Sequence, residues 1–125
     1  MRKRSSGKGW IDKMVFTTVG RNRMATLLAN DISVGECGTD GTKPVKSDTD
    51  LTAGVVATNQ TLSTTVASNV ITTEYVLGAT IGNGNTLREY GVFDASSNMF
   101  SRINFTDIAK DANTQVIITM RYTVE

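Results

Sequence analysis

The chain has 125 residues, of which 39% are hydrophobic, and a formal net charge of +1 at pH 7. This length predicts one domain with a single core, and the small charge argues against a protein that binds nucleic acid or an anionic membrane over its whole surface. The absence of histidine excludes a Ser–His–Asp triad and a histidine metal site. The sequence has no run of about 18 apolar residues, so it does not predict a membrane span.

Residues 1–9 combine basic side chains with glycine and serine, which predicts a flexible arm ahead of a single domain at 10–125. No apolar stretch follows the basic start, so a signal peptide is not predicted. The arm is either a solvated tail or a segment that orders on an acidic surface of a neighbouring protein. Nucleic-acid binding is disfavoured because no basic stripe with interleaved aromatic residues follows. The basic residues of the arm are Arg2, Lys3, Arg4 and Lys8.

The first part of the domain predicts one extended segment and one helix. Residues 10–19 are apolar with a mixed pattern, which indicates a short strand or an extended segment leading into the domain. Trp10 is expected either in the core or as an anchor on a partner. Residues 20–31 place apolar side chains at helical spacing, and we expect Thr18 or Gly20 to cap this helix.

A glycine-rich stretch up to residue 50 follows a short predicted strand at 32–34, and it predicts a long loop. A loop of this length in a compact domain tends to carry a contact. Cys37, the only cysteine, is expected there as a small buried residue; it excludes an intramolecular disulfide and favours a reducing origin. The acidic residues of the loop lack the ligand pattern of a calcium-binding EF-hand, and we expect them to cap turns instead: Asp40, Asp48 and Asp50.

Residues 51–69 are rich in threonine, alanine and valine, which favours extended structure. We expect strand pieces at 55–56 and 62–66, broken at residues 58–60. The weak amphipathic pattern of this region indicates the edge of a sheet or an assembly surface.

The second half of the chain has clearer strand patterns. Residues 70–81 alternate apolar and polar side chains, as a strand with one buried face does. Residues 82–85 then predict a tight turn with positive φ angles. Stretches 88–94 and 99–105 predict a hairpin around a turn of self-capping residues, and three of the four phenylalanines place much of the core at this hairpin.

The end of the chain completes the predicted sheet. Residues 106–113 predict a polar connection, and 114–125 predict a last strand with alternating apolar residues. Together with the earlier strands they predict a four-stranded antiparallel meander. With strands from the first half, it should close into a mainly β fold, an antiparallel β-sandwich or a jelly-roll-like barrel with one short N-terminal helix.

No catalytic grouping is predicted. Glu89 lies next to Arg88, but adjacent residues of a strand point to opposite faces and do not form one site. Glu89 is instead expected to pair with Arg102 or Arg121 on another strand, as a structural ion pair on an exposed face. We therefore predict no enzyme, with no catalytic, cofactor or metal residues, and a protein that works by binding other proteins.

Five motifs follow one another along the chain: G-R-N-R-M-A-T-L-L-A-N-D, I-S-V-G-E-C-G-T-D-G-T-K-P-V-K-S-D-T-D-L, R-E-Y-G-V-F-D-A, M-F-S-R-I-N-F-T-D-I-A-K and T-Q-V-I-I-T-M-R-Y-T-V. Their order and spacing over residues 20–124 resemble a family of small structural proteins, or modules, of tailed bacteriophages. That family tends to show a helix ending in a leucine pair, a glycine- and threonine-rich loop, an R-E-x-G-hydrophobic-F strand and an M-F-x-R strand. The loop departs from the usual glycine-threonine repeat at residues 36–38.

The resemblance implies a virion component of the decoration or tail-fibre kind. A small, nearly neutral all-β domain with a basic arm fits this class, and a short chain favours a piece that coats or joins a larger shell. The leading hypothesis is therefore a capsid decoration or cement protein that stabilises the assembled shell by binding it. The alternative is a tail, adaptor or fibre subunit of the virion. A third hypothesis, a host-glycan-binding module, is disfavoured by the few aromatic residues.

The expected partners are the major capsid protein or other virion proteins, with no nucleic acid and no membrane, in a virion assembled in the host cytoplasm. The threonine-rich middle suggests a homo-oligomer, a trimer or a dimer. The candidate contact residues lie in the arm and in the long loop: Arg2, Lys3, Arg4, Lys8, Trp10, Asp40, Lys43, Pro44 and Lys46.

Overall fold

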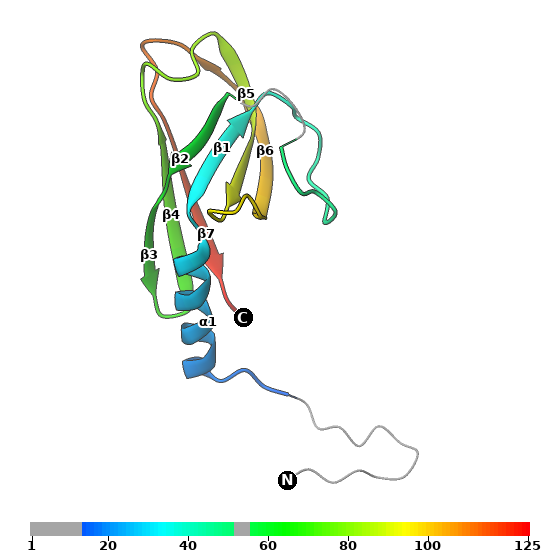
Figure 1. Cartoon of the computed structure of the whole chain (residues 1–125), viewed down its shortest axis with the longest axis vertical. Helices are drawn as coiled ribbons and strands as arrows, with labels where there is room; N and C mark the ends of the chain where they lie inside the picture. Colours follow the sequence, from blue (N-terminus) through cyan, green and yellow to red (C-terminus); the bar gives the residue numbers. More distant parts are fainter. Residues whose placement is uncertain (1–13, 52–55) are drawn as a thin grey trace.

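The computed structural model describes residues 14–51 and 56–125, which form one α-helix and seven β-strands (Figure 1). Helix α1 spans Thr18–Asp31. The strands are β1 (Val34–Gly38), β2 (Ala57–Thr61), β3 (Ser63–Ala67), β4 (Val70–Leu77), β5 (Asn85–Phe93), β6 (Met99–Lys110) and β7 (Val116–Thr123).

The strands form two antiparallel sheets, and the predicted β-sandwich is confirmed. One sheet has the order β2-β1-β5-β6 and the other has the order β3-β4-β7. The predicted meander is wrong, because β4 and β5 belong to different sheets: β4 pairs with β7 along its whole length, whereas β5 pairs with β1 and β6. Alternation shows which face of a strand is buried, but it does not show which strand lies beside it.

The hairpin and its preceding turn are confirmed. Strands β5 and β6 pair with each other, and Gly82 and Gly84 have positive φ angles of 75° and 85°. The polar connection predicted at 106–113 is wrong over its first half, because β6 continues to Lys110. Its last residues find backbone partners at the start of β5, where Asn85 lies opposite Lys110. The pairing of these backbones outweighs the polar character of the side chains.

Helix α1 is confirmed. Of the two alternatives for residues 10–19, a short strand is wrong for residues 14–19, whereas an extended segment that leads into the domain agrees with residues 14–17, which end in the extended backbone of Thr17. Residues 10–13 lie outside the described part. Residues 14–17 have no regular structure, and the helix begins at Thr18. Thr17, rather than Thr18 or Gly20, caps it, because its Oγ1 accepts a hydrogen bond of 3.0 Å from the Gly20 N–H.

In the region that follows α1, the predicted strand boundaries differ from the observed ones. Strand β1 begins at Val34 and continues through Cys37, where the sequence predicted a loop. Strand β2 includes residues 58–60, where the sequence predicted a break. The prediction of a sheet edge in 51–69 is confirmed, since β2 and β3 are outer strands of their sheets. Cross-strand pairing supports strand structure here that local propensity does not predict.

The core lies between the two sheets. Tyr75 of β4 and Tyr90 of β5 are both buried there, with ring centroids 5.0 Å apart and planes at 57°. Gly35 of β1 lies against both rings. The hairpin contributes Phe93 to the buried set, but Phe100 is exposed, so only part of the predicted phenylalanine core forms. The other buried apolar residues of this region include Ile71, Leu77, Leu87, Val92 and Val116.

Cys37 is confirmed as a small buried residue with no exposed surface. Burial disfavours its thiolate and raises the pKa of the thiol from 9.0 to about 11. Burial also raises the pKa of the Tyr75 and Tyr90 hydroxyls above the ordinary value of 10.0. All three groups therefore hold their protons more tightly in the folded protein than in the unfolded chain.

We expect the free energy of unfolding to be independent of these groups below about pH 9 and to fall as the pH rises from 9 to 11. The unfolded chain releases the Cys37 proton near pH 9, whereas the folded domain keeps it to about pH 11. The free energy of unfolding therefore decreases between these two pH values. The loss from Cys37 is on the order of 2 kcal/mol. Urea unfolding across this pH range measures it. Cys37→Ala should show a shallower fall, and identical pH profiles for the two proteins would contradict the expectation.

Candidate functional site

The predicted contact loop lies on the outer face of the β2-β1-β5-β6 sheet. Residues 39–51 leave β1 and run beside β5 and β6 (Figure 1). The loop explains why β5 is buried on both faces from Glu89 to Phe93: one face packs in the core, and the loop covers the other. Leu51 at the end of the loop is buried, and it lies against Gly91 of β5.

A buried ion pair fastens the loop to the sheet. The guanidinium of Arg102 donates from Nε to Glu89 Oε1 at 3.0 Å, and the two side chains are 2% and 0% exposed. Arg102 also donates from Nη1 to Asp48 Oδ2 at 3.2 Å and from Nη2 to the Thr42 carbonyl at 2.8 Å. The pair of Glu89 with Arg102 is as predicted, but the exposed face is wrong, because the sequence does not reveal the covering loop.

A second set of contacts holds the beginning of the loop. Glu89 Oε2 accepts a hydrogen bond of 3.0 Å from the Asp40 N–H. Arg88 donates to the Thr39 carbonyl at 3.1 Å and pairs with Asp107 at 2.9 Å, with side chains that are 40% and 60% exposed. Strand side chains bind four backbone groups of the loop, which are the Asp40 N–H and the carbonyls of Thr39, Gly41 and Thr42. The loop therefore has a defined position on the sheet.

Asp40 and Asp48 cap turns of the loop, as predicted, whereas Asp50 binds the N–H of the adjacent residue. Asp40 Oδ1 accepts from the Thr42 N–H at 2.6 Å, and the bonds from Thr42 lower the pKa of the Asp40 carboxyl. Asp48 accepts from the Val45 N–H at 2.9 Å, and Asp50 accepts from the Leu51 N–H at 2.8 Å. No group of three or more histidine, cysteine, aspartate or glutamate residues that could hold a metal ion occurs within the described ranges.

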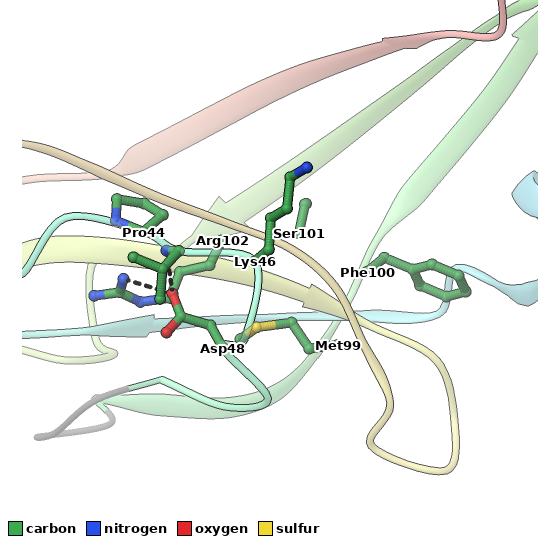
Figure 2. A pocket seen from close by; sticks show the side chains of 8 residues that line it. Pro44, Lys46, Asp48, Met99, Phe100, Ser101 and Arg102 are labelled. Atoms are coloured by element: carbon green, nitrogen blue, oxygen red, sulfur yellow. Dashed lines mark hydrogen bonds and ion pairs between the residues drawn. The ribbon is translucent and has the colours of Figure 1, made fainter.

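A shallow cavity of about 170 Å³ lies between the loop and the first residues of β6. Figure 2 shows the Arg102–Asp48 pair at its base, with Lys46 pointing away from this pair and Phe100 lying apart at the strand end. Because the charges at the base are already paired, the exposed apolar and basic groups of the rim are the ones available to a partner. The cavity is lined by Pro44, Val45, Lys46, Asp48, Met99, Phe100, Ser101 and Arg102.

The predicted contact residues fall into two groups. Lys43 and Lys46 are exposed on the loop, while Asp40 and Pro44 are half-buried because they hold its turns and its cavity. Their role as contact residues stays a prediction. The arm residues Arg2, Lys3, Arg4, Lys8 and Trp10 lie outside the described part of the chain.

Sequence reasoning missed an exposed apolar segment before and within α1. Met14, Val15, Phe16 and Val19 are exposed, and so is Leu27 further along the helix. Ala25 is the buried residue of α1. The C-terminal part of the helix packs against β3 and β4, while the N-terminal end of the helix projects beyond the sheets (Figure 1). The signal was present in the mixed apolar pattern of residues 14–19, which fits neither a half-buried strand nor a helix with one apolar stripe.

The described residues contain no helix with the length and apolar content that a membrane crossing requires. A comparison with protein-family models matches residues 13–124 to the N-terminal model of phage tail-collar fibre proteins. A search of curated proteins finds no significant match. The family match spans the helix, the loop and both sheets, so it covers every element described above.

Proposed function

We propose, because this chain belongs to the family of phage tail-collar fibre proteins, that it is a tail subunit that joins a fibre or collar to a neighbouring tail protein. The family membership makes the chain a structural component of the virion of a tailed phage. It supports the tail, adaptor or fibre subunit better than the capsid decoration or cement protein that the sequence alone favoured.

The observation that supports a joining role is the apolar segment at one end of the molecule. Met14, Val15 and Val19 are 75%, 72% and 78% exposed, and Phe16 is 45% exposed. Neighbouring apolar residues with this exposure are costly in water and mark surfaces that bind other proteins. The segment lies beyond the sheets, at the end where the chain enters the domain (Figure 1). A partner can therefore cover it without disturbing the sandwich.

The basic arm and the loop are the further contacts that we propose. The arm residues Arg2, Lys3, Arg4 and Lys8 precede the apolar segment in sequence, so an acidic partner surface beside an apolar patch would bind both. Lys43 and Lys46 add positive charge on the loop. The loop is held in place by the Arg102–Glu89 pair, so it can bind a partner without a large ordering cost.

We expect the double variant Phe16→Ser/Val19→Ser to fold normally but to be incorporated into phage particles at a level reduced by tenfold or more. Both side chains are exposed in the isolated domain, so their loss costs little folding free energy. Their burial against a partner would contribute about 2 kcal/mol or more to binding. Quantitative mass spectrometry of purified particles, after complementation of a phage that lacks the gene, measures the copies per particle.

Val76→Ser is the matched control, because Val76 is an exposed apolar residue on the outer face of β4 and outside the proposed contact. It should be incorporated normally. A wild-type protein present at a few or a few tens of copies per particle agrees with a tail position. Hundreds of copies would overturn the tail position in favour of the shell, and normal incorporation of the double variant would overturn the role of the apolar segment.

A further inference from the structure

Strand β7 lies at the edge of its sheet. It pairs with β4 through eight consecutive residue pairs, from Val116 opposite Leu77 to Thr123 opposite Val70, without a bulge. No described strand pairs with its other side. The backbone of this outer side is therefore open to another strand.

The hydrogen-bonding pattern shows which residues of β7 point outward. The Val124 N–H donates to the Asn69 carbonyl at 2.9 Å, in the position that continues the β4–β7 register. In an antiparallel pair, every second residue directs both of its backbone groups to the partner strand, and the residues between them direct theirs away. The outward residues of β7 are therefore Ile117, Thr119, Arg121 and Thr123, all of which are exposed.

The other three edges of the two sheets are protected. Strands β2 and β3 have only five residues each, and α1 packs against β3. Strand β6 is long, but its register with β5 shifts at two places. Short strands, irregularities and covering elements are the usual means of preventing unwanted strand pairing. Strand β7 has eight residues and a regular register, with one charged residue, Arg121, among its outward positions.

We propose that β7 pairs antiparallel with β7 of a second copy of this chain, about a two-fold axis at Met120. This register sets Ile117 opposite Thr123 and Thr119 opposite Arg121, so that all the outward residues of both strands find partners. It also keeps the two copies of Arg121 from facing each other directly. The two β3-β4-β7 sheets then form one continuous sheet across the axis.

Charge complementarity favours a second copy over an unrelated strand. Glu74 of β4 lies opposite Thr119, and in this register Thr119 lies opposite Arg121 of the other copy. Glu74 and the second copy's Arg121 therefore share one row on the same face, about 10 Å apart at the backbone with only a threonine between them. Their long side chains can meet over this threonine. Both residues are exposed, and neither makes an ion pair with a described residue of its own chain.

Thr119→Pro tests the pairing of the two edges. Its N–H points away from β4, so proline should leave the β4–β7 ladder intact while it removes an outward donor from each copy. Sedimentation equilibrium should show the wild-type domain as a dimer at about 100 μM, and the variant's dissociation constant should rise at least about tenfold. Thr119→Val keeps the N–H and should dimerise as the wild type does. A wild-type monomer, or a trimer, would overturn the proposal, since a two-fold pairing of edges closes at two copies.

Charge exchange provides a second test that does not alter the backbone. Glu74→Arg and Arg121→Glu should each weaken the dimer about fivefold or more, and the double variant should restore it. A double variant as weak as the two single variants would overturn the proposed register. Pairing at β7 is independent of how the domain attaches to the tail. Phe16→Ser/Val19→Ser should therefore dimerise normally even where it is not incorporated into particles.

Discussion

Arg102→Ala is expected to lower the free energy of unfolding by about 3–5 kcal/mol. The substitution leaves the Glu89 carboxylate at a site where its side chain is 0% exposed, without the guanidinium that now lies 3.0 Å away. Removing one partner of a buried pair costs more than the pair contributes, because the remaining charge stays desolvated. Urea unfolding of the two proteins at pH 7 measures the difference.

The same variant should release the loop. Arg102 holds the loop through the Thr42 carbonyl and through Asp48, and alanine removes both contacts. Lys46 is exposed on this loop and is followed by Ser47, so trypsin should cleave after Lys46 faster in Arg102→Ala than in the wild type. Faster cleavage after Lys46 would show that the pair positions the loop and does more than stabilise the sandwich.

Two controls separate charge burial from the loss of contacts. Arg88→Ala removes an exposed pair with Asp107, so it should destabilise the domain far less than Arg102→Ala. Glu89→Leu/Arg102→Met replaces the buried pair by apolar side chains and should recover most of the stability, yet leave the loop sensitive to trypsin. Equal losses for Arg88→Ala and Arg102→Ala would contradict the assigned difference in burial.

The regular strands could be predicted because their chemistry is local. Alternation in β4 and β7 identifies their buried faces, and the turn between β5 and β6 is built by its own residues. Asp94 Oδ1 accepts hydrogen bonds from the Ser96 and Asn98 N–H groups at 2.8 and 2.9 Å, which is the self-capping that such residues predict. These features need no knowledge of the rest of the fold.

The position of the loop over β5 and the burial of the Glu89–Arg102 pair could not be predicted, because the groups that meet there lie far apart in the sequence. Glu89 meets the Asp40 N–H over 49 positions, and Arg102 meets the Thr42 carbonyl over 60. Nothing local at Glu89 shows that a distant loop covers its face of the strand. The exposed residues near α1 were missed for the opposite reason: apolar side chains usually indicate burial within the domain, whereas Phe16 and Val19 lie beyond the sheets.

Gly35→Ala is expected to lower the free energy of unfolding by about 3 kcal/mol, at the upper end of the usual cost of overpacking a core. A Cβ at this position would lie 2.7 Å from Tyr75 Cδ2 and 2.9 Å from Tyr90 Cε1. These atoms belong to rigid rings that are buried against each other, so neither ring can turn aside without disturbing the core. For a domain of this size, the melting temperature should fall by about 10 °C.

Two other glycines make a graded series with Gly35. A Cβ at Gly91 would meet Leu51, Phe93 and Met99 at 3.0–3.2 Å, and flexible side chains among these can yield, so Gly91→Ala should cost less. A Cβ at Gly78 would meet nothing within 4 Å, so Gly78→Ala should leave the stability nearly unchanged. Thermal unfolding should therefore show the largest loss of stability for Gly35→Ala, a smaller loss for Gly91→Ala and the smallest for Gly78→Ala. If Gly35→Ala were as stable as Gly78→Ala, the two tyrosines would not pack over β1, and the two sheets would not meet at this glycine.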